Sequence, residues 1–191
     1  ITSGLYKFDD GPDLGDDAHR ATLLFSGPSY LAAKEAQTIL AEQYNVAAEL
    51  WSVTSYKRLR EDAINVQRRN RLNPLGERLV PMVTSKLQGS EGPIIAVSDW
   101  MAGVVGQINR WTPRPMSVLG TDGFGRSDTR EALRSFFEVD AAHVVVTVLN
   151  SLARDGEISR EVVADAITTF GIDPNRPDPA HPDTGATGIG R

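Results

Sequence analysis

The sequence predicts an α/β fold: a Rossmann-like, mostly parallel sheet with helices on both faces, then a helical end and a disordered tail. Two observations support this prediction. Short apolar segments alternate with amphipathic helical segments of about 10–15 residues, which is the pattern of β–α–β units. The first of these apolar segments runs directly into Ser26-Gly27-Pro28, a sequence that ends a strand.

The 191 residues are enough for one domain. We divide the chain into three parts. Residues 1–20 form an opening strand or linker (Leu5–Phe8) followed by an aspartate-rich loop. Residues 21–173 form the folded domain, and residues 174–191 form a flexible tail rich in proline and glycine. The chain starts at Ile1 rather than at methionine, so we expect it to be a piece of a longer polypeptide.

Four segments of the folded domain are short and apolar enough to be buried strands. They are Ala21–Phe25, Ala47–Val53, Pro93–Val97 and Met116–Leu119. A further element, whose type the sequence leaves open, lies at Met82-Val83.

The predicted helices lie between and after these strands. Apolar residues recur at helical spacing in Tyr30–Gln43, where Ser29 is a candidate N-cap, and helices also fit Ser55–Arg71 and Trp100–Trp111. The run Val144–Val148 is β-branched, yet Val145, Val148, Leu149 and Leu152 form one stripe and Asp140 can cap it, so we predict a helix. The last helix is Ser159–Gly171, with Ser159 as cap, Glu161 in its first turn and Gly171 at its end.

Composition excludes several classes of function. The chain has no cysteine, so disulfides, thiolate metal sites and cysteine nucleophiles are excluded, and its net charge of −5 gives no reason to expect binding to nucleic acid. No apolar run approaches a membrane span of about 18 residues, and no signal-peptide pattern opens the chain, so we expect a cytoplasmic protein without a membrane partner. His19, His143 and His181 have no metal-ligand spacing, and no Gly-x-Ser-x-Gly motif is present. We therefore predict no metal site, and these patterns give no indication of a catalytic residue.

Three predicted loops follow strands at the edge of the sheet where α/β proteins bind ligands: Ser26–Ser29, Val53–Ser55 and Gly120–Asp128. The last is the most unusual, and its candidate interface or ligand residues are Thr121, Asp122, Gly123, Phe124, Gly125, Arg126, Ser127 and Asp128. One interpretation is an anion cradle of glycine amides and Arg126. The other, which we favour, is a capped turn at an interface, with Asp128 and Glu131 forming a capping box.

A basic helical region, Lys57 to Arg71, could contact an acidic partner or the acidic segment Asp9–Asp17, although a solvated helix face also explains it.

Several longer stretches resemble a known family. They are Tyr44–Tyr56, Arg68–Pro74, Val80-Pro81, Ser98–Met101, Leu119–Arg130, Phe137–Ala141 and Val163–Ile167. Together they resemble the homodimeric bacterial pyruvate dehydrogenases, and the match covers nearly all of Gly4–Asp173. The Asp-x-Phe-Gly-x-Ser core of the Gly120–Asp128 loop is also similar to transketolase.

The resemblance implies that this chain is the C-terminal, transketolase-like domain of a longer enzyme in which upstream domains bind thiamine diphosphate and magnesium. That enzyme decarboxylates pyruvate and passes the acetyl group to the lipoyl group of the acyltransferase component. The Gly-Asp-Gly and Asn-Asn motifs that hold the cofactor are absent from this sequence, so we assign no cofactor-binding residue here and expect the chain alone to be inactive. The implied partners are the upstream domains, a second subunit and the lipoyl acyltransferase, and the implied role is a scaffold.

Two alternatives remain at this stage. One is a regulatory module that binds an anion through Gly123, Gly125 and Arg126, and the other is transketolase-type ketol transfer. Under the scaffold interpretation, Asp122→Ala or Phe124→Ala is expected to weaken docking more than folding.

Overall fold

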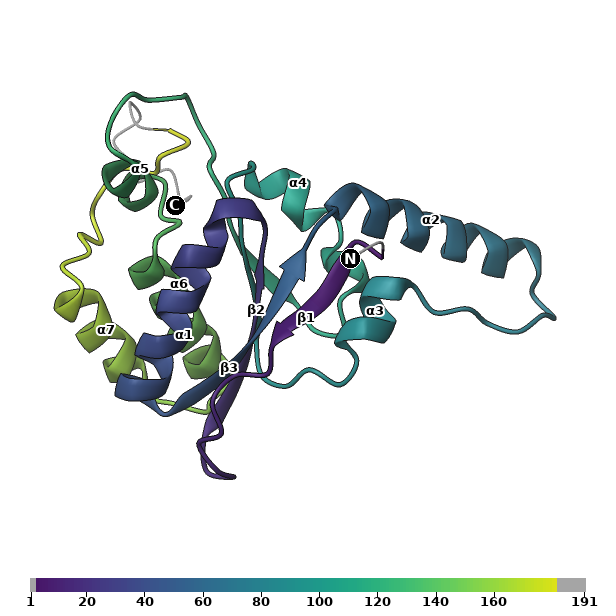
Figure 1. Cartoon of the computed structure of the whole chain (residues 1–191), viewed down its shortest axis with the longest axis horizontal. Helices are drawn as coiled ribbons and strands as arrows, with labels where there is room; N and C mark the ends of the chain where they lie inside the picture. Colours follow the sequence, from purple (N-terminus) through teal and green to yellow (C-terminus); the bar gives the residue numbers. More distant parts are fainter. Residues whose placement is uncertain (1–2, 182–191) are drawn as a thin grey trace, which may run out of the picture.

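The computed structural model describes residues 3–181 and contains a five-stranded sheet in the order β1-β3-β2-β4-β5 (Figure 1). The strands are β1 (Leu5–Asp9), β2 (His19–Phe25), β3 (Val46–Val53), β4 (Ile94–Val97) and β5 (Met116–Leu119). Strands β2 to β5 are parallel to their neighbours, and β1 pairs antiparallel with β3 at one edge. The predicted mostly parallel sheet is confirmed.

The strand order fixes where a crevice can form. The chain leaves β2 to form β3 on one side and later returns to form β4 on the other side. The loops after β2 and β4 therefore lead away in opposite directions. The place between these two loops is called the switch point, and open α/β sheets bind ligands there.

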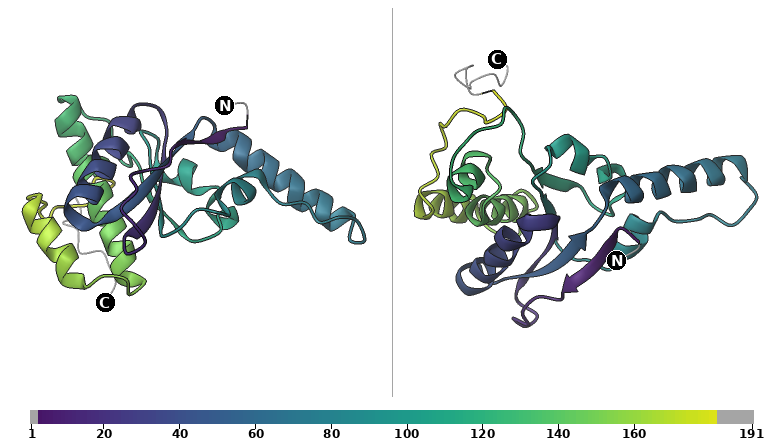
Figure 2. Two further views of the ribbon diagram at one scale, coloured as in Figure 1. Left: turned by 60° about the horizontal axis from the view of Figure 1, so that its bottom comes forward. Right: turned by 45° about the horizontal axis from the view of Figure 1, so that its top comes forward.

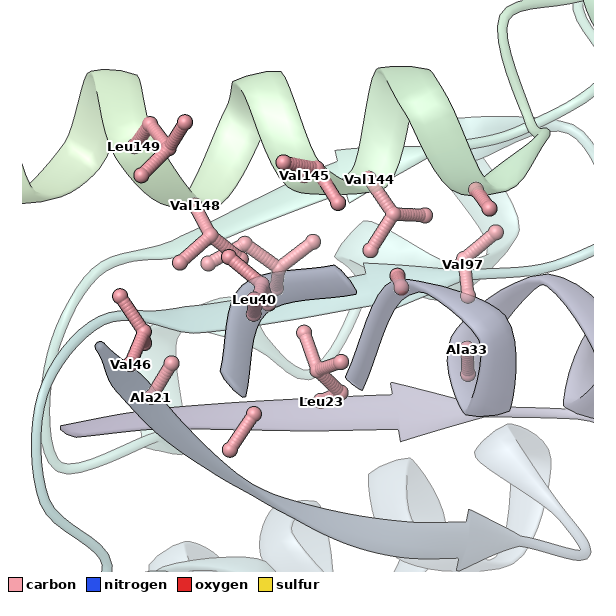
Figure 3. Close-up of a cluster of buried hydrophobic side chains, with 14 of the residues drawn as sticks. Ala21, Leu23, Ala33, Leu40, Val46, Val97, Val144, Val145, Val148 and Leu149 are labelled. Atoms are coloured by element: carbon pink, nitrogen blue, oxygen red, sulfur yellow. The ribbon is translucent and has the colours of Figure 1, made fainter. Parts of the chain in front are cut away.

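The larger core lies between the sheet and three helices, α1 (Tyr30–Tyr44), α6 (Ala141–Arg154) and α7 (Arg160–Thr169). Leu23 of β2 and Leu40 of α1 face Val145 and Val148 of α6, and all four are fully buried (Figure 3). The valine-rich run is thus helical, as predicted, because its apolar stripe covers the sheet. Asp140 caps it by accepting a hydrogen bond from the amide of His143 at 3.0 Å.

A second core covers the opposite face, where α2 (Tyr56–Leu72), α3 (Met82–Leu87) and α4 (Ala102–Gly106) pack with β1. Its fully buried members include Leu24, Leu59 and Ile94. The sheet therefore has helices on both faces, as predicted. The open element at Met82-Val83 is the start of α3.

Four local predictions are wrong in whole or in part. Trp100–Trp111 is not one helix but α4 followed by a 3₁₀ turn, η2 (Asn109–Trp111), and Gly103 and Gly106 weaken helix formation there. Ser29, which follows Gly27 in a 3₁₀ turn, η1 (Gly27–Ser29), makes no cap hydrogen bond to α1.

The two other errors also concern helix caps. Ser159 holds the N-cap position of α7, as predicted, but its side chain accepts no hydrogen bond from a helix amide within residues 3–181. The short helix α5 (Arg130–Phe136) is capped by Thr129, whose hydroxyl accepts from Ala132 at 3.2 Å, and not by Asp128.

By length and apolar composition, Arg130–Arg154 could cross a membrane, which the sequence prediction had not recognised. In the fold this region is two helices, α5 and α6, joined by residues 137–140. The apolar stripe of α6 packs on the sheet, so we assign α6 to the core, whereas α5 has no buried residue.

The outer half of α2 projects away from both cores (Figure 2). Its first half is held by Tyr56, Leu59 and Ala63, but no residue from 64 to 80 is buried. We call residues 64–80 the arm. The side chain of Asn70 holds the segment that runs back along α2. The Asn70 side-chain amide donates to the carbonyl of Leu79 at 2.9 Å, and the Asn70 side-chain oxygen accepts from the amide of Leu79 at 3.0 Å.

Candidate functional site

The loops that follow β2 and β4 are joined by hydroxyl groups. Ser26 Oγ and Ser98 Oγ lie 2.7 Å apart, and Ser29 Oγ donates to Asp99 Oδ1 at 3.0 Å. The Ser29 hydroxyl therefore bridges two loops. It does not cap α1, because the Ser29 backbone is helical (φ −65°, ψ −10°) rather than extended. These contacts hold the two sides of the switch point together.

The loop after β5 is anchored to the same place. The hydroxyl of Thr121 donates to the carbonyl of Asp99 at 2.6 Å, and its amide donates to the carbonyl of Trp100 at 3.0 Å. Asp122 accepts a hydrogen bond from the amide of Ala102, the first residue of α4, at 3.2 Å and 3.3 Å to its two oxygens. Asp122 is therefore part of the internal structure of the domain.

A cleft of about 530 Å³ opens beside this anchored loop. Four of the predicted loop residues line it: Thr121, Gly123, Gly125 and Arg126. Helix α5 adds two more arginines, Arg130 and Arg134, and the loop after β4 adds Asp99. The apolar part of the wall consists of Pro28, Leu133, Phe137 and Val139.

The guanidinium groups differ in how they are held. The Arg126 guanidinium lies 4.1 Å from the centre of the Phe136 ring. Arg134 makes one long hydrogen bond, 3.5 Å to the carbonyl of Pro28. Within residues 3–181, Arg130 has neither a hydrogen bond nor an ion pair. The cleft thus has two arginines with donors available and one fixed by stacking.

The segment after α7 runs along the outside of this region. Arg176 donates to the carbonyl of Ser135 at 3.1 Å, and its guanidinium lies 5.0 Å from the centre of the Phe136 ring. A side chain at Gly123, whose φ is +106°, would collide with the carbonyl of Pro179. The remainder of the predicted tail, residues 182–191, lies outside the described residues.

Four of the eight predicted loop residues do not line the cleft. Phe124 is 85% exposed, Asp122 is directed to α4, and Ser127 is exposed. Asp128 accepts from the amide of Thr129 at 2.7 Å. The loop therefore has a cleft side and an outer side that carries Phe124.

Sequence reasoning missed the contribution of α5. Arg130 and Arg134 are four residues apart and so lie on one helix face, a spacing that the sequence contains. The sequence did identify Ser26–Ser29 as a loop at the functional edge, and Pro28 lines the cleft.

The histidines have structural contacts. His19 Nδ1 lies 3.2 Å from Glu157, and His143 Nδ1 lies 2.6 Å from Asp140. Burial alone would raise the pKa of the Asp140 carboxyl, but the hydrogen bonds from His143 outweigh it and hold that pKa below its usual value. No group of three or more metal-ligating side chains exists within residues 3–181.

Comparison with known proteins gives matches over most of the chain. A family model described as the transketolase-like C-terminal domain matches residues 4–140. The pyruvate dehydrogenase E1 component of Pseudomonas aeruginosa is 42% identical over 180 residues, which are 94% of this chain and 20% of that protein. The Mycolicibacterium smegmatis protein of the same description is 43% identical over 91% of this chain and 18% of its own length.

A solved transketolase from Leishmania mexicana aligns with a TM-score of 0.51 at 17% identity, covering 80% of this chain and 18% of its own. That likeness supports the fold alone. The chain spans about one fifth of the length of the pyruvate dehydrogenase components that it matches.

Proposed function

We propose, from the premise that this chain belongs to the transketolase-like C-terminal domain family, that it is the C-terminal domain of a pyruvate dehydrogenase that uses thiamine diphosphate and magnesium. The single observation that carries this proposal is identity above 40% over more than nine-tenths of the chain to proteins of that description. In the proposed enzyme, the upstream domains decarboxylate pyruvate and transfer the acetyl group to the lipoyl group of the acyltransferase component.

The described residues of this chain do not fit a magnesium ion. A magnesium ion needs several oxygen ligands, and residues 3–181 offer no cluster of side chains that could hold one. We therefore assign no catalytic step to this chain. Its role is to dock against the upstream domains and the second subunit of a homodimer, and thereby to support the catalytic site from outside.

The arm supports a docking role. Leu72 is 56% exposed and Leu75 is fully exposed, so the tip of the arm is apolar. The arm also carries four arginines and one glutamate, which give it a charge of +3 in a chain of net charge −5. An apolar tip among arginines fits an acidic surface with an apolar recess.

The acidic segment of this chain is not the partner of the basic helix. Asp9 pairs with Lys34 and Asp10 with Lys7, whereas Lys57 pairs with Glu61 on its own helix. Within the described residues no ion pair joins α2 to Asp9–Asp17, so the arginines of the arm remain available to another domain.

The alternatives have different support. Ketol transfer has less support than pyruvate decarboxylation. The sequence identity to the solved transketolase is 17%, whereas the identity to the pyruvate dehydrogenase component is 42%. An anion-binding module is favoured by the arginine-lined cleft and is developed below.

The assignment is tested with the full-length polypeptide that carries this chain. We expect it to release carbon dioxide from pyruvate when thiamine diphosphate and magnesium are bound. Binding of the cofactor without release of carbon dioxide would contradict the pyruvate assignment.

The docking role is tested in the same polypeptide with Leu72→Ser and Leu75→Ser together. Both side chains are exposed here, so the fold of this domain should be unaffected, while dimer stability and pyruvate turnover should fall. Leu31→Ser is the matched control, because Leu31 is 57% exposed on α1. Arm variants that behave like this control would contradict a docking role for the arm.

A further inference from the structure

The cleft at the switch point has a charge that a scaffold role does not require. Three arginines line it against one carboxylate, Asp99, so its lining has a net charge of +2. Like-charged guanidinium groups that share a surface repel one another, and a bound anion would relieve that repulsion.

The arginines keep their hydrogen-bond donors. Arg126 uses the face of its guanidinium group to stack on Phe136, which leaves the N–H donors around its edge. Arg130 makes no hydrogen bond within residues 3–181, and Arg134 makes one long one. Such forked donors match the oxygens of phosphate.

The neighbouring loop adds main-chain donors. Within residues 3–181, the amides of residues 123–128 donate to no acceptor. Amides of a glycine-containing loop that lack an internal partner can form a concave anion site. Of these residues, Gly123, Gly125 and Arg126 line the cleft together with Arg130 and Arg134.

The other wall is apolar. Leu133, Phe137 and Val139 contribute to it, and the volume of about 530 Å³ lies within the range of roughly 300–1,000 Å³ typical of small-molecule sites. That volume exceeds what a phosphate ion alone needs. Asp99 accepts a hydrogen bond from Ser29 at 3.0 Å, and its carboxylate can also accept one from a ligand hydroxyl.

We propose that this cleft binds a phosphorylated small molecule of nucleotide size, with its phosphate on Arg126, Arg130 and Arg134 and its organic part on the apolar wall. A phosphate monoester carries a charge of about −1.5 to −2 at neutral pH, which balances the net charge of the lining. The proposal does not depend on the assignment of pyruvate decarboxylation to the upstream domains.

The experiment measures hydrogen exchange of the full-length polypeptide by mass spectrometry, with adenosine 5′-monophosphate as the probe. Thiamine diphosphate and magnesium are present in stoichiometric amounts, so that a diphosphate site elsewhere is occupied while the cleft remains open to the excess probe. We expect slower exchange in peptides that cover residues 120–137, because the unpartnered loop amides acquire an acceptor. Adenosine, which lacks the phosphate, should not slow exchange there.

Calorimetry of variants then measures the contribution of the arginines. Replacing both Arg130 and Arg134 with alanine should weaken binding by about tenfold or more, since each charge-assisted hydrogen bond contributes on that order. Replacing both with lysine keeps the positive charge but removes the paired N–H donors of the guanidinium groups, so we expect an intermediate affinity. The matched control is Arg154→Ala with Arg160→Ala, which removes the same charge at the last residue of α6 and the first residue of α7, away from the cleft.

Three results would overturn the proposal: no protection of residues 120–137 by millimolar adenosine 5′-monophosphate, equal protection by adenosine, or unchanged affinity in the Arg130→Ala, Arg134→Ala variant. The lysine variant and the control guard against a general loss of folding. Pyruvate turnover is measured separately, so a protein that binds the probe at the cleft but does not decarboxylate pyruvate would refute only the proposed function.

Discussion

Replacing Phe124 with alanine should separate docking from folding, because this ring adds almost nothing to the fold that the structure describes. Phe124 is 85% exposed and lies on the outer side of the loop. A change at an exposed site alters the free energy of unfolding by no more than about 0.5 kcal/mol. If docking buries the ring, its loss removes about 1.5–3 kcal/mol of association free energy. That is a weakening of roughly 10- to 150-fold.

Asp122→Ala is expected to behave differently. Its carboxylate accepts a hydrogen bond from the amide of Ala102 and so caps α4. Loss of such a cap lowers the free energy of unfolding by about 0.5–2 kcal/mol. The sequence-based expectation treated the two residues alike, whereas the structure separates them.

Two measurements check this pair. Urea unfolding of the chain gives the change in stability, and sedimentation equilibrium of the full-length polypeptide gives the dimer dissociation constant. We expect Phe124→Ala to change only the dissociation constant, and Asp122→Ala to change stability. If Phe124→Ala leaves the dissociation constant unchanged, or lowers stability as much as Asp122→Ala does, the docking argument for the outer side of the loop is refuted.

Three further substitutions test the fold by urea unfolding. Burial alone would raise the pKa of Glu49, but hydrogen bonds from Lys7 at 2.7 Å and Trp51 at 2.8 Å hold it below its usual 4.5. Glu49→Gln should therefore lower the free energy of unfolding by about 1–2 kcal/mol above pH 4.5. This difference is lost as the pH falls through the lowered pKa of Glu49. Glu35 is exposed, so Glu35→Gln should change the free energy of unfolding little at any pH. Gly92→Ala should lower the free energy of unfolding by on the order of 3 kcal/mol, because the new Cβ would overlap the carbonyl of Arg20. Gly89 has open space around it, so Gly89→Ala should leave stability nearly unchanged. Asp140→Ala should cost about 1–2 kcal/mol through loss of the α6 cap, and equal stability of variant and wild type would contradict that role.

Hydrophobic period and turn residues were sufficient to predict most of the fold. The β-branched run 144–148 was placed in a helix because its stripe continues to Leu152, and the stripe does cover the sheet. The antiparallel direction of β1 was not predictable, because Leu5–Phe8 contains no signal for the strand that it will pair with. The caps show the same limit, since the hydroxyl of Ser29 bonds to Asp99, 70 residues away.

The site was less predictable than the fold. The sequence identified Gly123, Gly125 and Arg126 as possible anion ligands, and all three line the cleft. Arg130 and Arg134 were not assigned to it, because their place depends on how α5 packs beside the ends of β2 and β4. Both Asp128 and Thr129 have side chains that can cap a helix, and only the path of the loop decides between them.

Strand β1 lies between the solvent and β3, whose residues are nearly all buried. It is contributed by the first residues of the described chain and has no other strand beyond it. A polypeptide that lacks residues up to Asp9, through proteolysis or truncation, would leave β3 as an unpaired apolar edge strand. Such edges recruit strands from other molecules, so these few residues protect the domain against self-association into aggregates. The five residues of β1 thus cover an edge that would otherwise be open to pairing with other chains.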